Sequence, residues 1–175
     1  MNCDILAGDM RSTPKSRAKE LRREKSTRPP HRVEYSYLSE EQLVQDFTSS
    51  LLSAKSPFDC QKLMPEFPHQ SGRTDVIGLR PSGDVISFEA KLKNWRKALH
   101  QAFRNTAYAH LSYVVLPSKS AKSALLYRHE FVERGVGLVA VTGKRITTRI
   151  SARKMIPLLP WVTEKAKESV THYNG

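Results

Sequence analysis

Residues 72–103 read GRTDVIGLRPSGDVISFEAKLKNWRKALHQAF, and this stretch decides the fold. Two runs rich in Val, Ile and Phe, TDVIGL and DVISFEA, flank the sequence Arg-Pro-Ser-Gly at residues 80–83. Apolar runs on either side of a Pro/Gly turn predict the two strands of an antiparallel hairpin. Charged residues interrupt both runs, so the hairpin is the first place to expect chemistry.

The predicted hairpin brings two carboxylates and one ammonium group together. Glu89 and Lys91 are two residues apart and are therefore expected on the same face of their strand. Antiparallel pairing about residues 81–83 places Asp75 opposite residues 88–90, within reach of Glu89 or one pleat away. Two carboxylates are suitable ligands for a hard cation such as Mg²⁺, and a lysine can hold or deprotonate an attacking water. These groups suit phosphodiester hydrolysis.

Asp75, followed after the turn by Glu89-Ala90-Lys91, resembles the catalytic signature of the PD-(D/E)xK nuclease superfamily, which has the restriction-endonuclease-like fold. Thr74 stands where the motif has its proline, a position at which the family varies. The resemblance implies that Asp75, Glu89 and the main-chain carbonyl of Ala90 bind Mg²⁺ or Mn²⁺, and that Lys91 positions or activates water. A surface ion pair at an exposed strand end is the alternative interpretation.

Composition favours a nucleic-acid partner. The 175 residues hold 29 Lys and Arg against 17 Asp and Glu, a net charge of +12, and their number suffices for one domain with a sizeable core. A basic protein without that role is the alternative. Cys3 and Cys60 have no metal-type spacing and are too few for a disulfide scaffold, which favours a reducing cytoplasm. No apolar run reaches the roughly 18 residues that cross a bilayer, and no export signal is evident, so we expect no membrane association.

Three parts are predicted along the chain. Residues 1–32 hold nine Lys or Arg against four acidic residues and few apolar ones, which predicts a flexible basic arm. The arm either grips phosphates or is an inert solvated tail. Residues 33–150 are the predicted nuclease-like α/β domain. Residues 151–175 form a basic extension that packs on the domain or trails from it. Its Trp161 is expected to pack against the domain, with stacking on a base as the alternative.

A helix is expected to begin after Ser39, which forms a capping box with Gln42, and apolar residues recur at helical spacing from Leu43 onward. Many members of the superfamily have a first-helix glutamate that reaches the metal site. Glu40 is the candidate here, with Glu41 in reserve. The helix macrodipole alone would also favour an acidic residue in this first turn.

A second helix is expected after Asn94, which can cap it. Lys97, Gln101, Arg104 and Tyr108 follow at i, i+4, i+7 and i+11, which predicts a line of polar groups along one helix face. The resemblance implies a role for Gln101 near the site, although relatives that pair this glutamine with a tyrosine have it four residues on rather than seven. A plain surface amide is the alternative. The candidates for nucleic-acid phosphate contacts are Arg73, Lys93, Lys97 and Arg104.

Further strands complete the predicted sheet. Residues 58–67 carry β-type residues together with Pro65, which indicates a bent or edge strand. Residues 111–117, LSYVVLP, form a continuous apolar run typical of a buried strand. Ser118 is expected to cap a helix that Gly135 ends. The last two predicted strands span residues 136–142, parallel to 111–117, and residues 146–150, at an edge.

This order predicts an α/β domain with a mixed central sheet flanked by helices, and the resemblance implies a restriction-endonuclease-like core from about Ser39 to Thr142. The first hypothesis is a metal-dependent nuclease, an endonuclease that acts on DNA, which the resemblance favours over RNA. One alternative is a non-cleaving nucleic-acid-binding or assembly subunit. Another is a nuclease subunit of a larger recombination or defence complex. A homodimer or a partner protein is compatible with each hypothesis.

Overall fold

The computed structural model describes residues 35–53, 56–70 and 72–173. The basic arm predicted at residues 1–32 lies outside the described residues. Within the described part, no helix is long and apolar enough to cross a membrane.

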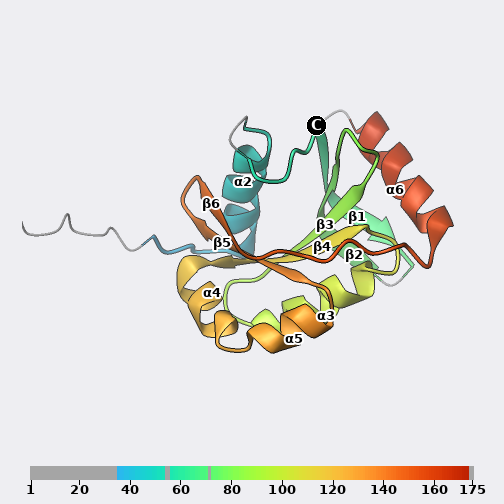
Figure 1. Cartoon of the computed structure of the whole chain (residues 1–175). Helices are drawn as coiled ribbons and strands as arrows, with labels where there is room; N and C mark the ends of the chain where they lie inside the picture. The colour runs from blue at the N-terminus through green and yellow to red at the C-terminus, as the bar shows by residue number, and fades with distance from the viewer. Residues whose placement is uncertain (1–34, 54–55, 71, 174–175) are drawn as a thin grey trace, which may run out of the picture. The chain divides into compact units, whose positions relative to one another are not determined.

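A six-stranded sheet in the order β1-β2-β3-β4-β5-β6 forms the centre of the domain (Figure 1). Strand β3 pairs in parallel with β4, and β4 with β5, whereas the other neighbours are antiparallel. The sheet is therefore mixed, and the predicted α/β class is confirmed. The strands are β1 (Lys62–His69), β2 (Gly72–Leu79), β3 (Val85–Ala90), β4 (Leu111–Pro117), β5 (Gly137–Thr142) and β6 (Arg145–Ile150).

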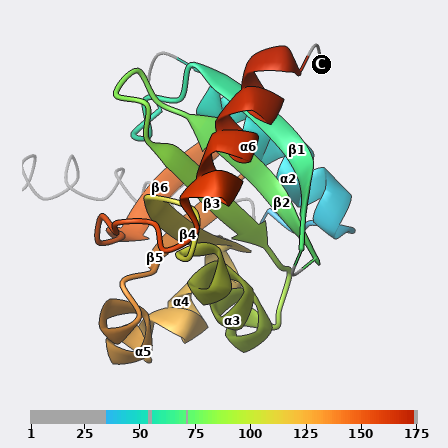
Figure 2. The same cartoon turned by 90° about the vertical axis from the view of Figure 1, so that its right-hand side faces the viewer.

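Helices pack on both faces of this sheet (Figures 1 and 2). One face carries α2 (Glu40–Leu51), whose Leu43 and Phe47 are fully buried in a cluster with Phe88 of β3. The other face carries two further clusters, one under α3 to α5 and one under α6. The helices of that face are α3 (Trp95–Asn105), α4 (Ser118–Leu125), α5 (Arg128–Glu133) and α6 (Pro160–His172).

The β2–β3 hairpin is confirmed. Its ladder runs from Val76↔Phe88 to Leu79↔Val85, and all six residues of β3 are buried. Extended by one residue, this register places Asp75 opposite Glu89. The main-chain N–H of Ala90 donates to the Asp75 carboxylate (2.8 Å). The carboxylate is therefore fixed at the end of β3, where the strand gives way to Lys91.

The predicted cap of α2 is also confirmed, and it fixes the position of Glu40. The Ser39 hydroxyl accepts a hydrogen bond from the Gln42 N–H (3.2 Å), and the Gln42 side chain accepts one from the Leu38 N–H (3.0 Å). Because the helix begins at this point, Glu40 and Glu41 lie in its first turn.

The helix predicted after Ser118 differs from the structure in two ways. Ser118 does not cap it: the residue lies inside the first turn, and its hydroxyl donates to the Val141 carbonyl of β5 (3.3 Å). The helix is also divided into α4 and α5. Tyr127 lies at the division, outside helical backbone geometry, and its ring packs beside Trp95 (centroids 5.2 Å apart).

Strand β1 and the C-terminal extension differ in part from their predictions. Strand β1 is an edge strand, and it begins at Lys62, later than residue 58. Helix α6, inside the predicted 151–175 extension, buries Val162, Ala166 and Val170 with Phe67 and Ile77 of the sheet. Trp161 was expected to pack against the domain and is instead 60% exposed, because the buried positions of α6 begin one residue later.

Candidate active site

Glu89 is a buried acid whose two oxygens have different surroundings. Glu89 is 1% exposed, and its oxygen Oε1 accepts a hydrogen bond from the Asn105 amide of α3 (2.7 Å). The other oxygen, Oε2, is buried, and no donor among the described residues reaches it with hydrogen-bond geometry, although the Thr74 hydroxyl is near enough to lower the pKa of Glu89. Burial, together with the nearby charge of Asp75, raises the pKa of Glu89 to about 7. Oε2 is therefore an acceptor that a cation or a proton could satisfy.

Asp75 is half-buried and lies close to Lys91. Its Oδ2 accepts the Ala90 N–H and is 3.9 Å from the Lys91 Nζ. Burial raises the pKa of Asp75, although the Ala90 hydrogen bond and the Lys91 charge oppose that rise. The charge of Asp75 disfavours ionisation of Glu89, and the charge of Glu40 disfavours ionisation of Asp75, so a cation close to these acids would favour their ionised forms.

Lys91 is held among oxygens from two distant parts of the chain. Its Nζ donates to Glu40 Oε2 of α2 (2.7 Å) and to the Ala90 carbonyl (3.0 Å), and its side chain is only 14% exposed. Burial lowers the pKa of Lys91, but the Glu40 hydrogen bond and the Asp75 charge outweigh burial and raise it. Lys91 is therefore a protonated donor at neutral pH, and Glu40 rather than Glu41 is its partner in α2.

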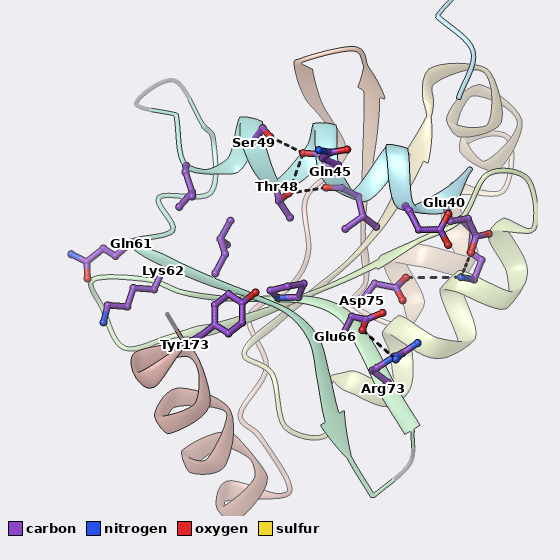
Figure 3. A pocket seen from close by; sticks show the side chains of 16 residues that line it. Glu40, Gln45, Thr48, Ser49, Gln61, Lys62, Glu66, Arg73, Asp75 and Tyr173 are labelled. Carbon is purple, nitrogen blue, oxygen red and sulfur yellow. Dashed lines mark hydrogen bonds and ion pairs between the residues drawn. The ribbon is translucent and has the colours of Figure 1, made fainter. Parts of the chain in front are cut away.

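Glu40, Asp75 and Lys91 lie at one end of a cleft of about 990 Å³ between α2 and the strands β1 and β2, whereas Glu89 is not among the residues that line it (Figure 3). Glu66 and Arg73 line the same cleft and form an ion pair at 3.3 Å. Glu66 lies in β1 with a left-handed backbone (φ 56°), an uncommon conformation for a residue other than glycine. The opposite end of the cleft is formed by Gln61, Lys62 and Tyr173.

The oxygen donors fit a hydrated divalent cation but not a closed metal cage. Across the described ranges, no group of three or more His, Cys, Asp or Glu side chains is placed to hold a metal ion. Mg²⁺ does not need such a group, since it keeps several waters and takes substrate phosphate oxygens alongside one or two carboxylates. The available donors are the Asp75 carboxylate, the unpartnered Glu89 Oε2 and the Ala90 carbonyl, all oxygens, which suit Mg²⁺ or Mn²⁺.

The structure does not bring all predicted residues to one place. Glu89 and Lys91 were expected on one face, yet Glu89 bonds to α3 and Lys91 to α2. Glu89 therefore contacts the helix on one face of the sheet, and Lys91 contacts the helix on the other face. Lys91 lies beyond Ala90, the last residue of β3, so strand alternation does not fix its side chain.

The predicted polar line on α3 is wrong at Gln101 and at Tyr108. Lys97 and Arg104 are exposed, but Gln101 is partly buried with its Oε1 lacking a hydrogen-bond partner among the described residues. Tyr108 is 2% exposed and its hydroxyl hydrogen-bonds to that of Thr74 (2.8 Å). The reason is that α3 ends at Asn105, so the i+11 position is no longer on the helix.

Two residues of this site were missed from the sequence. Asn105 holds Glu89, and its signal was its place four residues after Gln101, on the same side of α3. Thr74, at the position of the motif's proline, is fully buried. Its hydroxyl links Tyr108 and His69 and also lowers the pKa of Glu89.

All four candidates for phosphate contacts are exposed: Arg73, Lys93, Lys97 and Arg104. Arg73 lines the cleft. Lys97 and Arg104 lie on α3, and Lys93 lies between β3 and α3.

No family model matches this chain, and a search of curated proteins likewise gives no match. The solved structures that match part of this chain include the following two. A protein of unknown function from Silicibacter pomeroyi is 15% identical with a TM-score of 0.48, and the match covers 62% of this chain and 70% of that one. A repair endonuclease from Pyrococcus abyssi is 17% identical with a TM-score of 0.40, over 62% of this chain and 49% of that one. At these identities and scores, neither match assigns a function to this chain.

Proposed function

We propose that this chain is a metal-dependent nuclease that hydrolyses phosphodiester bonds in DNA. The observation that carries the proposal is the convergence of Lys91 with Glu40, Asp75 and the Ala90 carbonyl at the end of an open cleft. Glu89, with its unpartnered oxygen, is next to Ala90 and interacts electrostatically with Asp75. A metal-binding acid pair beside a buried ammonium group suits the charge that develops on a phosphate during hydrolysis.

Asp75, Glu89 and the Ala90 carbonyl would hold Mg²⁺ or Mn²⁺, which when bound supplies Lewis-acid stabilisation of the phosphate and lowers the pKa of water. The protein contributes their positions. Asp75 is fixed by the Ala90 N–H, and Glu89 by the Asn105 amide. Holding these groups in place before substrate arrives avoids reorganisation during the reaction.

Lys91 acts as a hydrogen-bond donor in this proposal. Its raised pKa keeps the ammonium group charged at neutral pH, so it orients the attacking water or a phosphate oxygen rather than removing a proton. Glu40 accepts one of the three ammonium protons and thereby positions Lys91. We therefore assign Glu40 a positioning role, with no direct contact to the phosphate required.

The proposal is tested with supercoiled plasmid, single-stranded DNA and branched DNA, each incubated with Mg²⁺, Mn²⁺ or EDTA. We expect cleavage of at least one substrate with either metal and none with EDTA. Binding without cleavage under every condition would favour the non-cleaving subunit. Cleavage that appears only after a partner protein is added would favour a subunit of a larger complex.

The exposed cations of α3 are expected to contact backbone phosphates. Replacing both Lys97 and Arg104 by Ala should weaken DNA binding to a similar degree for all sequences. It should also reduce the slope of the logarithm of the binding constant against the logarithm of the salt concentration by the amount that about two phosphate contacts contribute. Binding measured by fluorescence anisotropy from 50 to 200 mM salt checks this. Lys122 of α4 is exposed and outside this set, so Lys122→Ala is the matched control. An unchanged slope in the double variant would contradict the assignment.

A further inference from the structure

The cleft extends well beyond Lys91, and its lining changes along its length from charged residues to mostly apolar or uncharged ones. Its far end, formed by Gln61, Lys62 and Tyr173, lies away from Asp75 and Glu40 in Figure 3. Between the two ends the walls are mostly apolar or uncharged, with Val44, Thr48, Leu52, Leu63 and Pro65 among the lining residues. A volume of about 990 Å³ is in the range of sites that enclose one small molecule, such as a single nucleotide.

The charges in this cleft do not suit a run of phosphates. Glu40, Glu41, Glu66 and Asp75 face three cationic residues, of which Lys91 and Arg73 are already paired with acids. The third, Lys62, donates its Nζ to the Thr171 carbonyl (2.9 Å). A phosphate backbone is normally bound by cations that replace its counterions. The middle and far end of the cleft therefore suit the uncharged part of a nucleotide, its base.

Tyr173 supplies a surface on which a base can stack. The residue follows α6, is 42% exposed and lines the cleft. A base stacks on an aromatic ring whatever its identity, and such stacking is a common way of binding single strands without sequence preference. Gln61 and Lys62 line the same end, but their polar groups point away from the middle of the cleft in Figure 3, so Tyr173 is the residue that offers a base a surface there.

We propose that the cleft receives the base of an unpaired nucleotide beside the cleaved phosphodiester, with Tyr173 as its stacking surface. The inference rests on the proposed nuclease function and names its substrate class: single-stranded DNA, or an unpaired end. Within an intact duplex the bases are stacked on each other and would have to be extruded to enter. An uninterrupted duplex is therefore a poor substrate.

The test measures binding in EDTA, where no cleavage occurs. The probes are a labelled single-stranded oligonucleotide, the same strand with abasic sites, and a blunt duplex. The full chain should bind the strand with bases about tenfold more tightly than the abasic strand. Tyr173→Ala should remove most of that difference, and Tyr173→Phe should keep it. Tyr35 is an exposed tyrosine outside the cleft, so Tyr35→Ala is the matched control and should behave as the parent.

A parallel cleavage assay separates failure of this inference from failure of the nuclease function. If Asp75→Asn loses Mg²⁺-dependent cleavage while Tyr173→Ala discriminates between the probes as the parent does, the base site is overturned and the nuclease stands. Preferential cleavage of the blunt duplex by the parent would likewise overturn the base site. If Asp75→Asn cleaves as fast as the parent, the nuclease centre is overturned, and the substrate assignment falls with it.

Discussion

Replacing Glu89 by Gln is expected to reduce cleavage at least about 1,000-fold and, at the same time, to make the protein more stable at alkaline pH. Activity falls because the substitution removes a metal-binding carboxylate, and metal stabilisation of the phosphate contributes several kcal/mol. Stability rises because Gln keeps the shape and the acceptor for Asn105 without burying an ionised carboxylate.

The sign of the stability effect follows from the pKa of Glu89. Folding raises that pKa from 4.5 to about 7, so between these pH values the folded state holds a proton that the unfolded state has released. The stability that protonated Glu89 contributes is fully present below about pH 4.5 and is lost as pH rises to about 7. The free energy of unfolding of Glu89→Gln, relative to the parent, should therefore increase by about 3 kcal/mol between pH 4 and pH 8.

Urea unfolding of both proteins at the two pH values measures this difference. The matched control is Glu133→Gln, which removes an exposed glutamate from the end of α5. This control should change the free energy of unfolding little, and equally at both pH values. If the free energy of unfolding of Glu89→Gln, relative to the parent, is no larger at pH 8 than at pH 4, Glu89 titrates normally. The buried-acid description of the site would then be wrong.

Replacing Lys91 by Met should also reduce cleavage about 1,000-fold, because the ammonium group is the donor that orients water or phosphate. Replacing Glu40 by Gln should have a smaller effect, about tenfold, since Glu40 acts only through Lys91 in the proposed mechanism. The two variants therefore separate the residue that contacts the reacting atoms from the residue that positions it.

The pH dependence of cleavage distinguishes a Glu40 that tunes Lys91 from a Glu40 that only supports the fold. Cleavage requires protonated Lys91, so the rate falls at alkaline pH as Lys91 loses its proton. Because Glu40 helps to raise the pKa of Lys91, Glu40→Gln should move this fall to lower pH. Glu133→Gln is the matched control, because Glu133 is an exposed glutamate of α5 that does not line the cleft. An alkaline fall at the same pH in Glu40→Gln and in the parent would contradict the assignment.

The hairpin, the capped start of α2 and the mixed character of the sheet could be predicted because each depends on local pattern. Apolar alternation, a Pro-Ser-Gly turn and the Ser39–Gln42 pair are visible within a few residues. The same locality places Asp75 opposite Glu89, since a tight turn fixes the register of the strands that it joins.

The layered arrangement of the site could not be predicted in the same way. The contact between Lys91 and Glu40 spans 51 residues, and the contact between Glu89 and Asn105 depends on how closely α3 packs beneath β3. The surface line on α3 was wrong at Tyr108 because the helix ends at Asn105, where no glycine or proline marks a stop. Tertiary packing decides these features, and no short sequence pattern encodes them.

The most direct test of the central claim is the single-turnover rate of Mg²⁺-dependent DNA cleavage by Asp75→Asn. Asp59→Asn is the matched control, because Asp59 is an exposed aspartate outside the cleft whose left-handed backbone (φ 51°) asparagine also tolerates. With DNA at saturating concentration, the proposed centre predicts a rate at least about 1,000-fold below the parent for Asp75→Asn, and the parental rate for Asp59→Asn. A parental rate in Asp75→Asn would contradict the account, because Asp75, Glu89 and Lys91 could not then be the centre of a metal-dependent nuclease.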